Sequence, residues 1–484
     1  MKSFFQKFES YLLASLALGV ASFLLFLHYI SPGLEGGMDS YNHFLIAKNT
    51  WSHPKLFLDQ WGKPLYNILA SPFAQFGLTG MVVLNVISLI LCAVLSYRIT
   101  KLLRLRFAFI AFILTLFSPI FLDNTISSLT EPLCALMVLL SVYLIIDKKI
   151  ALGTIVAGLL PYARSEGFIV MAIVGLYLIV VLNDYKKLIF LLAGSLIFNT
   201  LGWIIEGEPF WLITQNPYIN FELSGRNVCG SGGLLSYVRQ GHYTFGLITS
   251  GLLALSTIAY AANWAKSRKP FYRTEIALLL SIFILYFLAH SFIWWQGMMG
   301  SCGYVRVMVV IAPIASIACV YAINVLLNIL RKHLPIIAKP IQTILILIVC
   351  INAVYVPYRY YAYKYPLAIS EEQAEYTKLA DWYKTSEYQD RTKIYLYPYF
   401  SIIGDIDPYS QTEHLDLWAS TMQYTKKGDI IIWDSHFGPN ESGIPLSQLE
   451  NDENWVKIHS ILPEKDIITL NDAVFKIHVF EKIK

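Results

Sequence analysis

The sequence predicts an α-helical polytopic membrane protein with about eleven transmembrane helices and a small α/β extracytoplasmic C-terminal domain. Hydrophobic residues make up 56% of the 484 residues and charged residues only 14%, whereas soluble domains carry roughly 25% charged residues. Long apolar runs recur up to residue 356, and the composition turns polar after Pro357. A soluble chain of this length needs far more polar surface, so lipid is the better solvent for most of it.

The predicted spans follow from run length, because a helix needs about 20 apolar residues to cross the hydrocarbon core. Nine runs qualify: 11–30, 78–97, 107–122, 131–147, 188–205, 244–264, 275–295, 305–328 and 338–356. The apolar region 150–182 is interrupted by Pro161–Gly167, and we expect two short helices that turn there, which makes eleven spans. The first run resembles a signal peptide, but it is long and no cleavage site follows it, so we expect a retained span.

Loop charges predict the orientation, because short cytoplasmic loops are rich in Lys and Arg. One alternating set of loops carries these residues: Arg98, Lys101, Arg104, Arg106, Lys148, Lys149, Lys186, Lys187, Lys266, Arg268, Lys269, Arg273, Arg331, Lys332 and Lys339. We therefore expect a multi-pass inner (plasma) membrane protein with a cytoplasmic N-terminus. The first outer loop then covers 31–77, in a membrane domain of residues 1–356.

Residues 357–484 predict a separate extracytoplasmic domain. Alternating apolar runs at Lys393–Tyr397, Asp429–Trp433, Trp455–Leu462 and Val474–Phe480 are typical of strands, and Glu371–Tyr383 has a helical period. The sequence therefore favours a small α/β domain that hangs on the outer face.

Charge and cysteine content exclude several classes of function. The net charge of +4 is small and dispersed, so we expect no nucleic-acid partner. The six cysteines show no CxxC or metal-ligand spacing, which argues against a thiolate metal site. Cys229 and Cys302 fall in predicted outer loops, where they form either a disulfide or two free thiols.

The first outer loop carries a compact polar motif. Asp39 and His43 are four residues apart, so a helix places both on one face, with Asn42 beside them. The preceding glycines allow a sharp turn after the first span. The alternative is structural, with Asp39 or Ser40 capping a surface helix.

Other polar residues are predicted at outer helix ends, where charged groups often mark function or a specific pair. Lys63 follows Trp61 and either binds an anionic lipid phosphate or snorkels. Thr130-Glu131-Pro132 is typical of a helix start, and this capping role explains it without function. The remaining residues of this outer group are Arg164, Glu166, Arg226, Arg239, His242, Tyr304 and Arg306.

Four segments resemble the GT-C glycosyltransferases, polytopic enzymes that use polyprenyl-phosphate sugars. They are Gly37–His43, Trp61–Tyr66, Leu129–Pro132 and Ala163–Gly167, and the last has Ser165 where proline is usual. The resemblance covers most of residues 1–356. Asp39 has no adjacent acid of the kind that family members often carry, so a divalent metal stays open.

The resemblance implies transfer of a sugar from a polyprenyl-phosphate donor to an acceptor glycan, lipid or protein at the membrane. It implies Asp39 as general base, His43 as its orienting partner and Glu131 as an acceptor-positioning group. It also implies that the donor phosphate is bound by Lys63, Arg164 and Arg306. Asn42, Glu166 and Tyr304 are implied as supporting residues. We expect inversion at the anomeric carbon, since a single base suffices for one displacement.

Two other classes remain as alternatives. A transporter or lipid flippase predicts inverted repeats and broken helices at mid-membrane depth, whereas this sequence shows no convincing repeat. In a non-enzymatic scaffold for envelope assembly, Asp39 would have no catalytic role and its loop would be free to vary.

Overall fold

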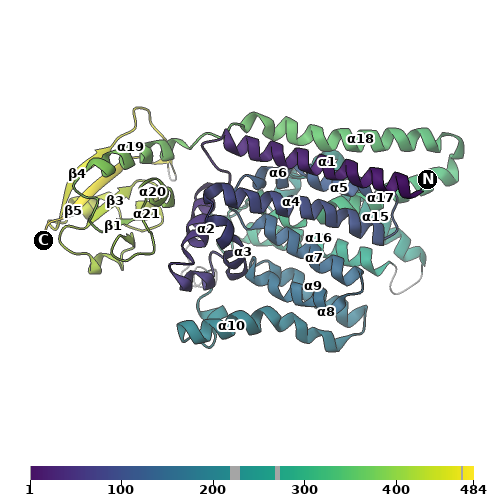
Figure 1. Ribbon diagram of the computed structural model, residues 1–484, viewed down its shortest axis with the longest axis horizontal. Coiled ribbons are helices and arrows are strands. Elements are labelled where there is room, and N and C mark those ends of the chain that lie inside the picture. The colour runs from purple at the N-terminus through teal and green to yellow at the C-terminus, as the bar shows by residue number, and fades with distance from the viewer. Residues whose placement is uncertain (1, 218–228, 268–272, 470–471) are drawn as a thin grey trace.

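The computed structural model describes residues 2–217, 229–267, 273–469 and 472–484. A bundle of long helices forms one body, and a smaller α/β domain sits at one end of it (Figure 1). The N-terminus lies at the end of the bundle away from this domain (Figure 1). Arg226, Arg268 and Lys269 lie outside the described residues.

Every apolar run predicted from the sequence is helical. Seven segments of the described chain are long enough to cross a membrane: α1 (Lys2–Tyr29), α4 (Gly77–Leu102), η3 (Tyr185–Leu192) with α10 (Ala193–Glu206), α15 (Leu247–Ser267), α16 (Thr274–Gln296), η4 (Val305–Ile311) with α17 (Ala312–His333), and α18 (Pro335–Tyr361) with η5 (Ala362–Lys364). An eighth candidate joins α5 (Ala108–Leu116) to α6 (Pro119–Thr125) across a bend of 46°. The polytopic fold class is confirmed.

Three shorter apolar helices complete the set. They are α7 (Glu131–Ile146), α8 (Ile150–Leu159), which runs into η2 (Leu160–Tyr162), and α9 (Gly167–Val180). The two short helices expected for 150–182 are therefore present, and they turn where proline and the charged residues were predicted to interrupt them. The total of eleven crossings remains a prediction, because these three helices are shorter than a full span.

Burial separates central from peripheral helices. Most of α17 is buried, from Ala312 to Ile323, whereas α1, α10 and α18 expose many apolar side chains. Backbone groups inside each helix bond to one another, so an apolar exposed face suits lipid. The core of the bundle is thus built around α4, α7 and α17.

The first outer loop folds into α2 (Gly37–Asn49), η1 (Pro54–Leu58) and α3 (Pro64–Ala74). Gly36 and Gly37 both have positive φ, 91° and 59°, so these glycines do provide the expected turn. The N-cap of α2 is Gly36, without a side-chain bond, so the capping alternative for Asp39 and Ser40 is wrong.

The C-terminal domain holds a five-stranded sheet in the order β2-β1-β3-β5-β4. The strands are β1 (Lys393–Tyr395), β2 (His414–Asp416), β3 (Ile430–Asp434), β4 (Trp455–Ile461) and β5 (Ile477–Lys482). β1 is parallel to β2 and β3, whereas β5 is antiparallel to β3 and β4. The helices are α19 (Glu371–Thr385), α20 (Pro398–Ile403), η6 (Met422–Tyr424), α21 (Phe437–Asn440) and α22 (Leu446–Glu450). The α/β class is confirmed, and β2 is the strand that the sequence did not predict.

The two parts meet at α2. The rings of Tyr41 and Tyr399 are 5.2 Å apart, and His53 Nε2 lies 2.7 Å from Asp407 Oδ2. The linker is joined to the end of α1, since the amide of Gly33 donates to the carbonyl of Leu367 at 2.9 Å. Because α18 continues past residue 356 to Tyr361, the first polar residues are still helical, and the boundary between 356 and 357 remains a prediction.

Three short helices lie on the connection between α10 and α15: α11 (Trp211–Thr214), α13 (Ser236–Arg239) and α14 (Gly241–Thr244). Cys229 and Cys302 form a disulfide, with Cα atoms 5.0 Å apart. Of the two alternatives left open by the sequence, the structure therefore contains the disulfide.

Candidate active site

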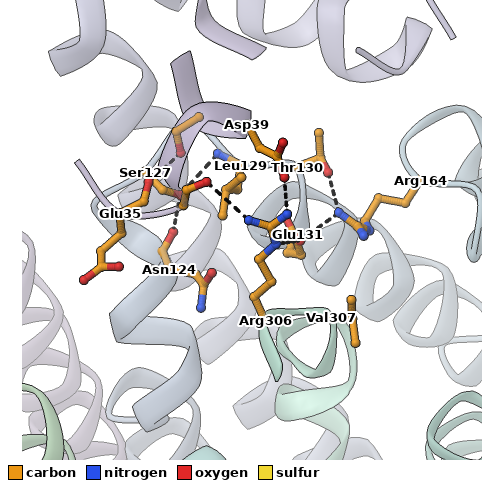
Figure 2. Close-up of polar contacts among 12 residues, drawn as sticks. Glu35, Asp39, Asn124, Ser127, Leu129, Thr130, Glu131, Arg164, Arg306 and Val307 are labelled. Carbon is orange, nitrogen blue, oxygen red and sulfur yellow. Dashed lines mark hydrogen bonds and ion pairs between the residues drawn. The ribbon is translucent and has the colours of Figure 1, made fainter. Parts of the chain in front are cut away.

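Arg306 lies at the centre of the polar cluster beneath α2 (Figure 2). It follows the loop between α16 and η4, and its guanidinium pairs with the carboxylate of Asp39. The same guanidinium donates to the carbonyl of Gly36 at 3.3 Å. Arg306 and Asp39 are 267 positions apart in the sequence, so the fold creates this pair.

Glu131 joins this pair to a second arginine. Its carboxylate is 1% exposed and lies 3.4 Å from Arg306 Nε and 2.9 Å from Arg164 Nη1. Figure 2 shows Glu131 between the two arginines. A buried carboxylate is costly unless it is paired, so the two guanidinium groups stabilise its charge.

Arg164 binds its neighbours through the two terminal nitrogens of its guanidinium, while Nε makes no hydrogen bond in the described part of the chain. Nη1 donates to Thr130 Oγ1 at 2.7 Å, and Nη2 bonds to Glu166 Oε1 at 2.8 Å. Thr130 is the N-cap residue of α7, with Glu131 and Pro132 in the first turn, so the predicted helix start is confirmed. The hydroxyl of Thr130 makes no capping bond to the helix and accepts from Arg164 instead. Burial alone raises the pKa of Glu166, but Arg164 and His290 outweigh it and lower that pKa to about 2.

Lys63 lies beside a hollow between α3, the α8–α9 turn and α11. Nζ donates to the carbonyl of Gln60 at 2.7 Å and to Ser165 Oγ at 3.2 Å, and Lys63 is only 6% exposed. Burial, together with the charge of Arg164, lowers the pKa of Lys63 to about 8 although Glu166 opposes this shift. The hollow is small, with a cavity volume of about 10 Å³, and its lining includes Gln60, Lys63, Tyr162, Ser165 and Trp211.

His43 lies in an aromatic stack. Its ring is 4.5 Å from that of Trp61 and 5.5 Å from that of Tyr66. Burial, followed by the charges of Lys63, Arg164 and Arg306, holds the pKa of His43 well below its usual range. The imidazole is therefore neutral at physiological pH, and its Nδ1 makes no hydrogen bond within the described part of the chain.

The structure brings together most of the residues predicted for the site. Ion pairs and hydrogen bonds connect one set, which is Asp39, Glu131, Arg164, Glu166 and Arg306. Lys63 reaches the same turn through Ser165, and the ring of Tyr304 lies 4.6 Å from Arg306 Cζ.

Other predicted residues are not part of this network. Asn42 makes no hydrogen bond in the described ranges, although it lies on α2 between Asp39 and His43. Arg239 and His242 contact each other, since His242 Nδ1 is 2.9 Å from the carbonyl of Arg239, and the ring of His242 faces Tyr360 instead.

The carboxylates of the cluster do not fit a resident metal ion. Among the described residues, no three His, Cys, Asp or Glu side chains converge in a way that could hold one. The guanidinium of Arg306 occupies the side of Asp39 that a cation would need. We therefore derive no step through a metal.

Sequence reasoning missed three contributors: the carbonyl of Gly36, the hydroxyl of Thr130 and the hydroxyl of Ser165. Thr130 and Ser165 lie inside segments that carried the resemblance, and Gly36 directly precedes one, so the sequence located the regions but not these atoms. A backbone carbonyl has no sequence signal. The departure from proline at Ser165 was the one available sign that this position has a polar partner.

Comparison with solved structures gives the fold. ArnT from Cupriavidus metallidurans bound to undecaprenyl phosphate aligns over 96% of this chain and 97% of its own, with 9% identity and a TM-score of 0.56. The same protein in the apo state has 8% identity and a TM-score of 0.56 over the same shares. The oligosaccharyltransferase of Archaeoglobus fulgidus, in complex with Zn and sulfate, has 13% identity and a TM-score of 0.50, over 82% of this chain and 62% of its own.

These neighbours are GT-C glycosyltransferases, so the GT-C-like fold predicted from the sequence is confirmed. No family model and no curated protein matches the sequence. At this level of identity the likeness establishes the architecture of a multi-pass membrane protein. The reaction of this chain has to be inferred from the residues of the site.

Proposed function

We propose that this chain is a membrane glycosyltransferase that moves a sugar from a polyprenyl-phosphate donor to an extracytoplasmic acceptor. The observation that carries the proposal is the pair between Arg306 and Asp39, a carboxylate and a cation brought together on the GT-C-like fold. ArnT was solved with undecaprenyl phosphate, which supports a lipid-phosphate donor. A cytoplasmic N-terminus and a plasma-membrane location belong to the same proposal.

Lys63 and Arg306 are the groups we assign to the donor phosphate. Lys63 borders the hollow, and a lysine ammonium binds phosphate as a point charge. Of the two arginines, Arg306 is the one that pairs with Asp39, whereas Arg164, which the resemblance placed in this role, pairs with Glu131 and Glu166. We therefore assign Arg164 to holding Glu131 in place.

Asp39 is the general base of the proposed step, and 39% of its side chain is exposed. It takes the proton of an acceptor hydroxyl while the hydroxyl oxygen bonds to the anomeric carbon. The bond from that carbon to the phosphate oxygen breaks, and its electron pair leaves with the phosphate. Lys63 and Arg306 stabilise the charge of the departing group. A single displacement inverts the anomeric carbon.

Glu131 receives a different role from the one that the resemblance implied. Its carboxylate is buried between Arg306 and Arg164, so an acceptor does not reach it. We assign Glu131 to fixing Arg306 beside Asp39. His43 of α2 stacks on Trp61, and we assign it to holding α2 against the segment that carries Lys63.

The test is transfer by the purified protein in lipid nanodiscs. Undecaprenyl-phosphate hexoses, hexosamines and aminoarabinose serve as donors, and a glycolipid, an oligosaccharide and a Ser/Thr peptide as acceptors. We expect release of undecaprenyl phosphate with one donor, and a loss of about 100-fold or more in Asp39→Asn, because a positioned base contributes roughly that much. The matched control is Asp381→Asn, which removes an exposed carboxylate on α19.

Two results are decisive against the proposal. Wild-type protein that releases no lipid phosphate with any donor rejects sugar transfer from these lipids. Full activity in Asp39→Asn removes Asp39 from the mechanism and leaves the fold without an assigned base.

A further inference from the structure

The carboxyl ends of two parallel strands in the C-terminal domain face α2. The ring of Tyr399, which follows β1, contacts Tyr41 of α2, and Phe437, which follows β3, packs on the same apolar cluster as Met38. The rings of Phe437 and Tyr397 are 5.4 Å apart. In sheets with parallel strands, ligands bind beyond the carboxyl ends of those strands. This edge of the domain therefore meets the membrane part beside Asp39.

The loop after β3 has a fixed shape. Asp434 is buried, and its carboxylate accepts from the amides of His436 at 2.9 Å and Phe437 at 2.7 Å and from the hydroxyl of Tyr376 at 2.6 Å. Asn440 Nδ2 donates to the carbonyl of His436 at 2.7 Å. A loop held at so many points positions the residues that follow it.

Glu441 follows α21 (Phe437–Asn440), at the edge of the C-terminal domain that faces α2 (Figure 1). Its amide donates to the carbonyl of Phe437 at 2.9 Å, while its half-buried carboxylate makes no hydrogen bond or ion pair inside the described ranges. Burial raises the pKa of Glu441, His436 lowers it, and the charge of Asp39 raises it again. The charge of Asp39, from the other part of the molecule, thus acts on the carboxylate of Glu441.

We propose that Glu441 is the acceptor-binding carboxylate of the site and that the acceptor is a sugar. This inference rests on the proposed function. A carboxylate only accepts hydrogen bonds, so its partner has to be a donor group. A sugar offers neighbouring hydroxyls, one of which Glu441 holds while Asp39 deprotonates the next.

The experiment measures how the transfer rate depends on acceptor concentration in Glu441→Gln. We expect the half-saturating concentration of the oligosaccharide or glycolipid acceptor to rise about tenfold or more, because a hydrogen bond to a charged group is lost. The half-saturating concentration of the donor stays within about twofold. Glu441→Asp keeps the charge on a shorter side chain and gives an intermediate value.

Glu453→Gln is the matched control, since Glu453 lies in the same domain with its side chain 87% exposed. The inference is overturned if the half-saturating acceptor concentration is the same in Glu441→Gln and Glu453→Gln. Use of the peptide alone as acceptor also overturns it, and in both cases the proposed transferase activity stands. Only inactivity of the wild-type protein removes both.

Discussion

At the scale of single residues, the protonation of Lys63 sets the pH range of donor binding. An exposed lysine has a pKa of about 10.4, whereas burial lowers the pKa of Lys63 to about 8. The ammonium is present below this value and is lost as the pH rises through it. The phosphate of the ligand loses its second proton near pH 6, so we expect the affinity for undecaprenyl phosphate to be greatest near pH 7 and to fall as the pH passes about 8.

The measurement is binding of radiolabelled undecaprenyl phosphate to the protein in nanodiscs from pH 6 to 10. Lys63→Arg keeps its charge over this range and should give a flat profile above about pH 7 at its own affinity. Lys55→Gln, which changes a lysine with a 71% exposed side chain, should follow the wild-type curve. A wild-type affinity that stays constant to pH 10 takes Lys63 out of the phosphate site.

The ion pairs of Arg164 are expected to stabilise the folded protein. Its guanidinium, 15% exposed, holds the carboxylates of Glu131 and Glu166. Arg164→Ala leaves both carboxylates in a site built for a cation, so we expect a loss of about 3 kcal/mol or more in the free energy of unfolding. Thermal unfolding in detergent measures this, with the exposed Arg98→Ala as control. Equal unfolding of the two variants would show that Arg164 is not needed for folding.

At the scale of elements, the junction between α1 and the linker depends on Gly33. A Cβ at this position would lie 2.2 Å from the carbonyl oxygen of Ala368, which is backbone and cannot swing aside. Gly33→Ala therefore has to move the linker away from the end of α1. We expect faster proteolysis between residues 362 and 370 and a lower transfer rate.

Limited proteolysis followed by mass spectrometry reads out the cleavage site. The control is Gly19→Ala in α1, where a Cβ meets nothing within 4 Å. Cleavage of Gly33→Ala at the wild-type rate would mean that the linker absorbs the added methyl group and that the contact with Ala368 is unimportant.

The elements were predictable where length and composition decide them. A run of apolar residues specifies a membrane helix almost by itself, so both ends of α16 and the start of α4 were predicted to within about one residue. The run 305–328 was predicted as one helix, whereas the structure divides this region into η4 and α17. β2 was not found, because its three residues are too few to show an alternating pattern. Thr130 shows a second limit, since it begins α7 as predicted but its hydroxyl bonds to Arg164, a partner 34 positions away.

At the scale of the whole molecule, the sequence predicted the participants of the site better than their roles. Charge placement on one set of loops predicted that Asp39 and Arg306 share a face, and they form a pair. It did not predict that Glu131 is enclosed by two arginines, because burial depends on how α7, η4 and the α8–α9 turn pack. Nothing in the sequence singled out Glu441 as a site residue, since its place in the site depends on how the C-terminal domain packs on α2.

The disulfide gives a test of orientation that does not depend on loop charges. Disulfides persist in oxidising compartments, and Cys302 shortly precedes Arg306, whose partner Asp39 lies at the C-terminal-domain end of the bundle. This end should therefore face outward, as a polyprenyl-phosphate donor in the outer leaflet requires. In Cys302→Ser the exposed Cys229 becomes a free thiol on that face.

We expect a membrane-impermeant maleimide to label Cys302→Ser in intact cells, and to label the wild-type protein only after treatment with an impermeant reductant. Cys92, Cys134 and Cys319 are buried, and the partly buried Cys350 lies inside the apolar helix α18, so these four cysteines contribute little background. The double variant Cys229→Ser/Cys302→Ser is the control and should stay unlabelled. If Cys302→Ser is labelled only after the cells are permeabilised, Asp39 and the C-terminal domain face the cytoplasm, and the donor has to be sought in the inner leaflet.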